Sequence, residues 1–200
     1  MKISQFLCHT IEEICLDLST NEKTAKKWKT PQTQYLRAFE RIWELMKEPI
    51  KVLFICHGNI CRSTMAESVF THMVKEKNID HLFEIASAAT SREEIGNPPH
   101  YGTVNKLRQV GIPVVPHRAV QMTKADYEYY DYLIGMDSAN IRNMNRIADG
   151  DPEGKIYKLL SFANISRDVA DPWYTGDFDS TYRDVTTGLE AFLEYVLSDK

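Results

Sequence analysis

Residues 51–64 read Lys51-Val-Leu-Phe-Ile-Cys56-His-Gly-Asn-Ile-Cys61-Arg-Ser-Thr64, and this stretch decides the fold. The apolar run up to Cys56 is typical of a strand that is buried on both faces. A tight polar loop and then a helix are predicted to follow. Such a unit aims backbone N–H groups and a helix N-terminus at one point, which is how proteins bind phosphate. A thiol at that point adds a nucleophile, so the residues predict a cysteine enzyme that transfers phosphate.

Each of several loop residues has a property that suits an anion-binding site. The helix N-terminus, the converging amides and Arg62 all favour an anion, so we expect Cys56 to be a thiolate at neutral pH. Gly58 permits close backbone approach, and Asn59 tolerates a left-handed conformation. Arg62 is expected to hold two phosphate oxygens with its planar fork. Ser63 is placed to donate a hydrogen bond to the thiolate.

Other uses of this loop fit the residues less well. A nucleotide P-loop requires Gly-Lys-Ser/Thr, which does not follow here. A zinc site made of Cys56, His57 and Cys61 would lack the Cys-x2-Cys spacing and a second pair of ligands. A purely structural Cys56 would leave the neighbouring glycine, asparagine, arginine and serine as a coincidence. We therefore expect no metal and no cofactor.

Strands and helices are predicted to alternate after residue 50. The strands are expected at 51–56, 83–88, 132–136 and 155–160, and the helices at 63–77, 101–110, 138–148 and 179–197. This order predicts an α/β fold with a doubly wound, four-stranded parallel sheet flanked by helices. Ligands of such sheets bind beyond the C-terminal ends of the strands, where we expect Cys56, Ser87 and Asp137.

Residues 1–49 predict an all-helical extension in front of a second unit, 50–200. Helices are expected at 3–18, 20–29 and 30–46. The extension is predicted to be either a cap on the surface of the following domain or a module for dimerisation or partner binding.

The cysteines and lysines of the extension have simple interpretations. Cys8 and Cys15 would lie about 10 Å apart along the first helix, so they are expected to be buried apolar residues and not a disulfide. A lysine cluster favours either an acidic partner or a solvated face: Lys23, Lys26, Lys27 and Lys29.

Composition narrows the class of protein. The 200 residues carry a formal net charge of -4, with 43% hydrophobic and 26% charged residues, as in globular proteins. The acidic balance argues against a nucleic-acid binder. No apolar run reaches the roughly 20 residues of a membrane span, and the first residues turn acidic too early for a signal peptide. The sequence predicts a cytoplasmic protein that contacts neither nucleic acid nor membrane.

The segment Cys56-His-Gly-Asn-Ile-Cys-Arg-Ser63 closely resembles the signature of the low-molecular-weight protein tyrosine phosphatases. Further likeness lies at Ser87-Ala-Ala-Thr-Ser, Ile95-Gly-Asn-Pro-Pro99, His117-Arg-Ala119, Met136-Asp-Ser138 and Asp171-Pro-Trp-Tyr-Thr-Gly176. The resemblance covers residues 51–198. It implies a phosphatase domain at 50–200 that hydrolyses phosphotyrosine in protein substrates.

The resemblance also implies roles for individual residues. Cys56 would attack phosphorus and form a cysteinyl-phosphate, Arg62 and the loop amides would stabilise the transition state, and Asp171 would be the general acid and then the general base. The phosphate-binding loop would comprise His57, Gly58, Asn59, Ile60, Cys61 and Ser63. Asn59, Ser87 and His117 would brace the loop, and Asp137 would help to hold its arginine.

Cys61 matches the second loop cysteine of the family. It would either trap an oxidised Cys56 as a reversible disulfide or serve as a small packed side chain.

The walls of the cleft show where the chain departs from the family pattern. Trp173 and Tyr174 would form an aromatic wall suited to a flat ring, unless they pack inward as core. Many members of the family carry an aromatic residue on the opposite wall, where this chain has Glu93. His57 likewise replaces a more usual apolar or small residue. A carboxylate facing the substrate predicts a preference for basic over acidic flanking sequences.

Two neighbouring reactions and one binding function remain as alternatives. Relatives specialised for phosphoarginine tend to carry threonine at the position of Ile60, so Ile60 favours phosphotyrosine. Arsenate reductases share the loop but need later cysteines, and none follows Cys61. A phosphate-binding module without catalysis would be indicated by loss of the nucleophile, arginine or acid, and all three are present.

Overall fold

The computed structural model describes residues 48–198. The expected helices and cysteines of the extension lie outside the described residues: 3–18, 20–29, 30–46, Cys8 and Cys15. No helix within 48–198 combines the length and apolar character that crossing a membrane requires.

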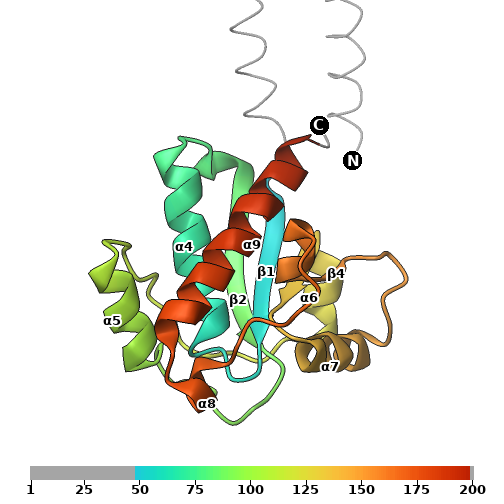
Figure 1. Ribbon diagram of the computed structural model, residues 1–200. Coiled ribbons are helices and arrows are strands. Elements are labelled where there is room, and N and C mark those ends of the chain that lie inside the picture. Colours follow the sequence, from blue (N-terminus) through green and yellow to red (C-terminus); the bar gives the residue numbers. More distant parts are fainter. Residues whose placement is uncertain (1–47, 199–200) are drawn as a thin grey trace, which may run out of the picture. The chain divides into compact units, whose positions relative to one another are not determined.

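A four-stranded parallel sheet forms the centre of the described part of the chain (Figure 1). Its strands are β1 (Ile50–Cys56), β2 (Phe83–Ala89), β3 (Tyr132–Gly135) and β4 (Ile156–Lys158), in the order β2-β1-β3-β4. Every pair is parallel, so each connection is a crossover. The central position of β1 puts its C-terminal end, Cys56, between β2 and β3.

Helices cover both faces of the sheet. They are α4 (Arg62–Glu76), α5 (Tyr101–Gln109), α6 (Lys124–Tyr129), α7 (Ser138–Ala148), α8 (Pro172–Thr175) and α9 (Phe178–Ser198), with 3-10 turns at Asp80–Leu82 and Leu159–Ala163. Val52 and Phe54 of β1 pack into one core with α4 and α9. Leu53 and Ile55 pack into a second core with α6 and α7. The continuous apolar run therefore serves two faces, as expected for a doubly wound sheet.

Phe70 of α4 anchors the larger core. Its ring contacts Phe54 at 5.7 Å, Phe83 at 5.2 Å and Phe192 at 5.4 Å between centroids. These contacts join α4 to β1, β2 and α9. Burying such a ring contributes about 1.5–3 kcal/mol, so this cluster fixes where α4 begins relative to the end of β1.

The predicted fold class is confirmed, with local corrections. The fourth strand, expected at 155–160, ends at Lys158 because Leu159 begins a 3-10 turn. Helix α6 was not predicted, although Thr123 and Asp126 form a capping box at its start. Ser87 does not lie at a strand end: it pairs with Phe54 inside β2.

Candidate active site

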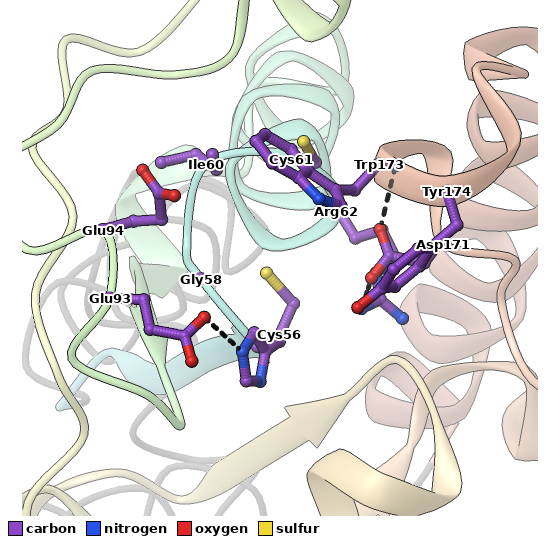
Figure 2. Close-up of a pocket in the computed structure, with 11 residues that line it drawn as sticks. Cys56, Gly58, Ile60, Cys61, Arg62, Glu93, Glu94, Asp171, Trp173 and Tyr174 are labelled. Carbon is purple, nitrogen blue, oxygen red and sulfur yellow. Dashed lines mark hydrogen bonds and ion pairs between the residues drawn. The ribbon is translucent and has the colours of Figure 1, made fainter.

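A pocket of about 110 Å³ lies at the C-terminal end of β1 (Figure 2). Its lining residues come from three segments: Cys56, His57, Gly58, Ile60, Cys61 and Arg62; Glu93 and Glu94; Asp171, Trp173 and Tyr174. The three segments follow β1, follow β2 and form the start of α8. Within residues 48–198 no group of His, Cys, Asp and Glu side chains is arranged to hold a metal ion.

The sulfur of Cys56 is the centre of the loop. Cys56 is 3% exposed, and the backbone N–H of Asn59 donates to its Sγ at 3.3 Å. The hydroxyl of Ser63 lies 3.1 Å from the same sulfur. Because Asn59 Nδ2 donates to Ser63 Oγ at 2.9 Å, the serine proton is available for the sulfur. Both neighbours are thus donors to Cys56, and donors favour an anionic sulfur.

Asn59 ties the loop to the rest of the fold. It has the expected left-handed backbone, with φ 57°, and its side chain is fully buried. Nδ2 also donates to Ser87 Oγ at 2.8 Å, while Oδ1 accepts from the Val120 N–H at 3.1 Å. His117 Nε2 lies 2.7 Å from the same Oδ1 and therefore carries the proton that it donates. The three predicted braces meet in one network.

Glu67 is a member of this network that the sequence reasoning missed. Ser87 Oγ donates to Glu67 Oε2 at 2.6 Å, and His117 Nδ1 lies 3.4 Å from that oxygen. Burial raises the pKa of Glu67, against the Ser87 hydrogen bond, and burial lowers the pKa of His117. The Glu67 carboxyl group and the His117 imidazole therefore face each other in a partly buried site. The sequence offered one sign of this role: the Glu67 carboxylate lies on the apolar side of the predicted helix, one turn from Phe70.

Arg62 is held between two carboxylates. Nη1 donates to Asp137 Oδ2 and Nη2 to Asp171 Oδ2, both at 2.6 Å. Burial opposes the charge, but the charges of Cys56 and Asp171 and the contact with Asp137 outweigh it, and the pKa of Arg62 is raised. Nε is buried and has no hydrogen-bond partner within the described residues. The guanidinium fork therefore contacts Asp171 as well as Asp137, the residue that the resemblance implied would help to hold it.

Asp171 enters the pocket from the start of α8. It is the N-cap of this helix: its Oδ1 accepts from the Trp173 N–H at 3.1 Å, and Pro172 occupies the first helical turn. This leaves Oδ2 for Arg62. The capping geometry explains why an Asp-Pro pair at this point directs a carboxyl group into the pocket.

Trp173 and Tyr174 are surface residues of the pocket wall. Their exposed fractions are 57% and 84%, so they are not core. Trp173 rests edge-on against His100, with centroids 5.7 Å apart. Figure 2 shows both rings on the same side as Asp171.

The opposite side carries Glu93 and Glu94. His57 Nε2 and Glu93 Oε2 form a hydrogen-bonded pair at 3.0 Å. A Cβ on Gly58 would lie 3.1 Å from Glu94 Cγ, so Gly58 makes room for this side chain. The sequence reasoning did not identify Glu94, and its position beside Glu93 in the chain was the only signal.

Cys61 is a buried thiol beside the nucleophile. It is 5% exposed and packs with Ile60 and Ala119. Burial, with added repulsion from Cys56 and Asp171, raises the pKa of Cys61 to about 12. Cys56 and Cys61 are both free cysteines. At neutral pH Cys61 is therefore a neutral thiol.

Comparisons with known proteins agree with this geometry. The family model described as "Low molecular weight phosphotyrosine protein phosphatase" matches residues 51–200. The low molecular weight protein-tyrosine-phosphatase YfkJ of Bacillus subtilis is 38% identical over 153 residues, covering 76% of this chain and 98% of YfkJ. The human low molecular weight phosphotyrosine protein phosphatase is 40% identical over 148 residues, covering 72% and 93%.

Solved structures of similar proteins match the same part of this chain. The crystal structure of YfkJ matches with a TM-score of 0.75 and 37% identity, over 78% of this chain and 99% of that chain. The structure of DARP, a Drosophila arginine phosphatase, matches with a TM-score of 0.69 and 28% identity, over 76% and 100%. The matches span nearly the whole of each relative and about three quarters of this chain.

Proposed function

This chain belongs to the low-molecular-weight phosphotyrosine protein phosphatases, and from that membership we propose that it hydrolyses phosphotyrosine in protein substrates. The reaction class is phosphoric monoester hydrolysis. The observation that carries the proposal is one pocket that contains the Cys56 thiol, the Arg62 guanidinium and the Asp171 carboxyl group.

In the first step Cys56 Sγ attacks phosphorus and the bond from phosphorus to the phenolic oxygen breaks. Asp171 gives its proton to that oxygen, and a cysteinyl-phosphate forms. Arg62 and the loop amides stabilise the charge on the equatorial oxygens. The unpartnered Nε of Arg62 supports this role. Phosphate oxygens also compete with Asp171 for Arg62, which frees the carboxyl group for proton transfer.

In the second step water attacks phosphorus and Asp171 takes a proton from that water. The sulfur–phosphorus bond breaks, phosphate leaves and the thiolate is restored. The hydrogen bonds from Ser63 and from the Asn59 N–H support the proposal that the loop stabilises the departing sulfur.

The shape of the pocket favours an aromatic leaving group. The exposed rings of Trp173 and Tyr174 provide a wall against which a phenyl ring can stack. Ile60 supplies an apolar contact at the loop. Phosphoarginine is the competing substrate, because the chain is also similar to DARP.

The test is hydrolysis of phenyl phosphate by the wild type, Cys56→Ser and Asp171→Asn. We expect turnover by the wild type, none by Cys56→Ser, and a fall of roughly 10²- to 10⁴-fold for Asp171→Asn, as for loss of a general acid. An inactive wild type or an active Cys56→Ser would contradict the proposal. Faster turnover of phosphoarginine than of phosphotyrosine would reassign the substrate.

A redox response of Cys56 is part of the proposal. Peroxide would oxidise Cys56 to a sulfenic acid, and the Cys61 thiol would condense with it to a disulfide, releasing water. The two free thiols on one pocket support this. If so, peroxide inactivation of Cys61→Ser should be less reversible by dithiothreitol, because its unprotected sulfenic acid oxidises further. Full recovery would contradict the protective role of Cys61.

The proposal also covers location and chain organisation. A cytoplasmic location fits a thiol nucleophile, because reducing compartments keep thiols free; cell fractionation tests it. We also propose that residues 50–200 form the phosphatase domain and that residues 1–49 are an extension that serves as a cap or binds a partner or a second copy.

A further inference from the structure

The mouth of the pocket has two unlike sides. Trp173 and Tyr174 form an exposed aromatic side, whereas the segment after β2 brings Glu93 and Glu94 to the other. In Figure 2 the side chains of Glu93 and Glu94 point from their loop towards the phosphate-binding loop. A phosphotyrosine bound at Cys56 would place its flanking residues between these sides.

Glu93 has a partner that is easily replaced. Its carboxylate contacts the His57 imidazole at 3.0 Å, and the two side chains are 72% and 49% exposed. Exposed pairs of this kind contribute little to stability. A guanidinium, which binds a carboxylate through two parallel hydrogen bonds, is a better partner than one imidazole nitrogen.

Glu94 lacks a cationic partner among the described residues. Its Oε2 accepts from the neutral Asn97 Nδ2 at 2.6 Å, and its stem rests on Gly58. The charge of this carboxylate therefore stays available at the pocket mouth.

Neighbouring arginines do not neutralise this side. Arg92 precedes Glu93, but its Nε donates to Gln121 at 2.7 Å, and Arg92 does not line the pocket. Arg62 is engaged by Asp137 and Asp171. The side formed by Glu93 and Glu94 thus carries negative charge next to the anion-binding loop.

We propose that Glu93 and Glu94 recognise an arginine or lysine side chain that flanks the phosphotyrosine, with the incoming cation replacing His57 at Glu93. The substrate class is a phosphotyrosine segment with an adjacent basic residue. This inference rests on the proposed function and names its substrate more narrowly. The same carboxylates repel a flanking acidic residue.

The experiment compares two phosphotyrosine peptides that differ only in the flanking residue, arginine or glutamate, and uses phenyl phosphate as a reference without flanks. We expect kcat/KM for the arginine peptide to be higher by roughly 5- to 20-fold at low salt, because each exposed pair is worth up to about 5-fold. The preference should shrink in 0.5 M salt, where charges are screened over a few ångströms.

Substitutions assign the preference to these side chains. Glu93→Gln and Glu94→Gln should each lower the ratio of the two kcat/KM values, and the double variant should bring it near one. Glu190→Gln is the matched control, because this exposed glutamate of α9 is outside the pocket and should leave the ratio unchanged.

The outcomes separate the two proposals. Phenyl phosphate turnover with equal kcat/KM for both peptides, or with a preference for the glutamate peptide, would overturn this inference alone. A wild-type ratio that persists in the double variant would also overturn it. No turnover of phenyl phosphate by the wild type would overturn both this inference and the proposed function.

Discussion

Ser63 has a role that can be separated from substrate binding. Its hydroxyl lies 3.1 Å from Cys56 Sγ and receives a hydrogen bond from Asn59, which leaves its proton for the sulfur. The proposed second step releases a thiolate, so this donor matters most when the cysteinyl-phosphate breaks down. Ser63→Ala should lower kcat by roughly 10- to 100-fold, the value of a hydrogen bond to a charged group.

The kinetic sign of this role is a burst of product release before the steady state. Rapid mixing of Ser63→Ala with an aryl phosphate should release about one equivalent of phenol per active site before slow steady-state turnover. Ser198→Ala is the control, since its hydroxyl only donates to a backbone carbonyl near the end of α9. An unchanged kcat and no burst for Ser63→Ala would contradict the proposal that Ser63 stabilises the departing sulfur.

The two pocket cysteines should differ in reactivity. Burial raises the pKa of Cys61 to about 12, so its neutral thiol form predominates at every pH below that value. Iodoacetamide reacts with thiolates. Between pH 7 and 9 we expect alkylation of Cys56, blocked by inorganic phosphate, and little alkylation of Cys61 within the same time. Peptide mapping by mass spectrometry separates these sites from Cys8 and Cys15, and faster modification of Cys61 than of Cys56 would contradict the expectation.

At the scale of single residues, sequence reasoning reached the groups that lie in local motifs. Cys56, Arg62 and Asp171 were chosen from the loop signature and the Asp-Pro pair, and the pocket brings all three together. Glu67 was missed because its partners come from other segments, and Glu94 because its place beside Gly58 exists only in the folded chain. A buried carboxylate is intelligible only once Ser87 and His117 are beside it.

Glu67 links three elements and shows how the fold supports the loop. It lies on α4, accepts from Ser87 of β2, and faces His117 in the segment between α5 and α6. Glu67→Leu would leave the Ser87 hydroxyl and the His117 imidazole without this partner. A buried polar group left unpaired costs about 1–3 kcal/mol, so urea denaturation should give a lower unfolding free energy by about that amount.

The conservative variant makes the test specific. Glu67→Gln keeps an oxygen that accepts from Ser87, and should lose less stability and less kcat than Glu67→Leu. Glu76→Leu and Glu76→Gln are matched controls at the exposed end of α4. Equal losses for leucine and glutamine at position 67 would show that the oxygen that accepts from Ser87 contributes nothing measurable.

The boundaries of helices and strands could be predicted from the sequence where the local capping signals and the pattern of burial agree. Helix α7 begins at Ser138 and ends at Ala148 as expected, because Asp137 caps its first turn and Asp149 takes a left-handed conformation after it. The fourth strand was predicted too long because Leu159 and Leu160 are fully buried in a 3-10 turn. Apolar character alone does not distinguish that turn from a strand.

At the scale of the whole molecule, alternation of strands and helices predicted a parallel sheet but not the order of its strands. The order β2-β1-β3-β4 follows from the change of direction after β2: β3 pairs on the other side of β1. Helices α4 and α9 then serve one face, and α6 and α7 the other. Figure 1 shows α8 at the end of the sheet where β1 gives way to the phosphate-binding loop. This reversal creates the crevice for the ligand.

The described residues that line the pocket lie between Cys56 and Tyr174, and the match to YfkJ spans 98% of that relative. A chain of residues 50–200 should therefore fold on its own and unfold in one cooperative transition. It should hydrolyse phenyl phosphate with a kcat/KM within about two-fold of the full chain, as expected for a complete domain.

Light scattering of both chains gives their oligomeric states and thereby tests the role of residues 1–49. A dimeric full chain with a monomeric 50–200 would make residues 1–49 an interface, whereas two monomers would favour a cap. Aggregation or inactivity of 50–200 would show that the catalytic fold depends on the extension, against the division into two units proposed above.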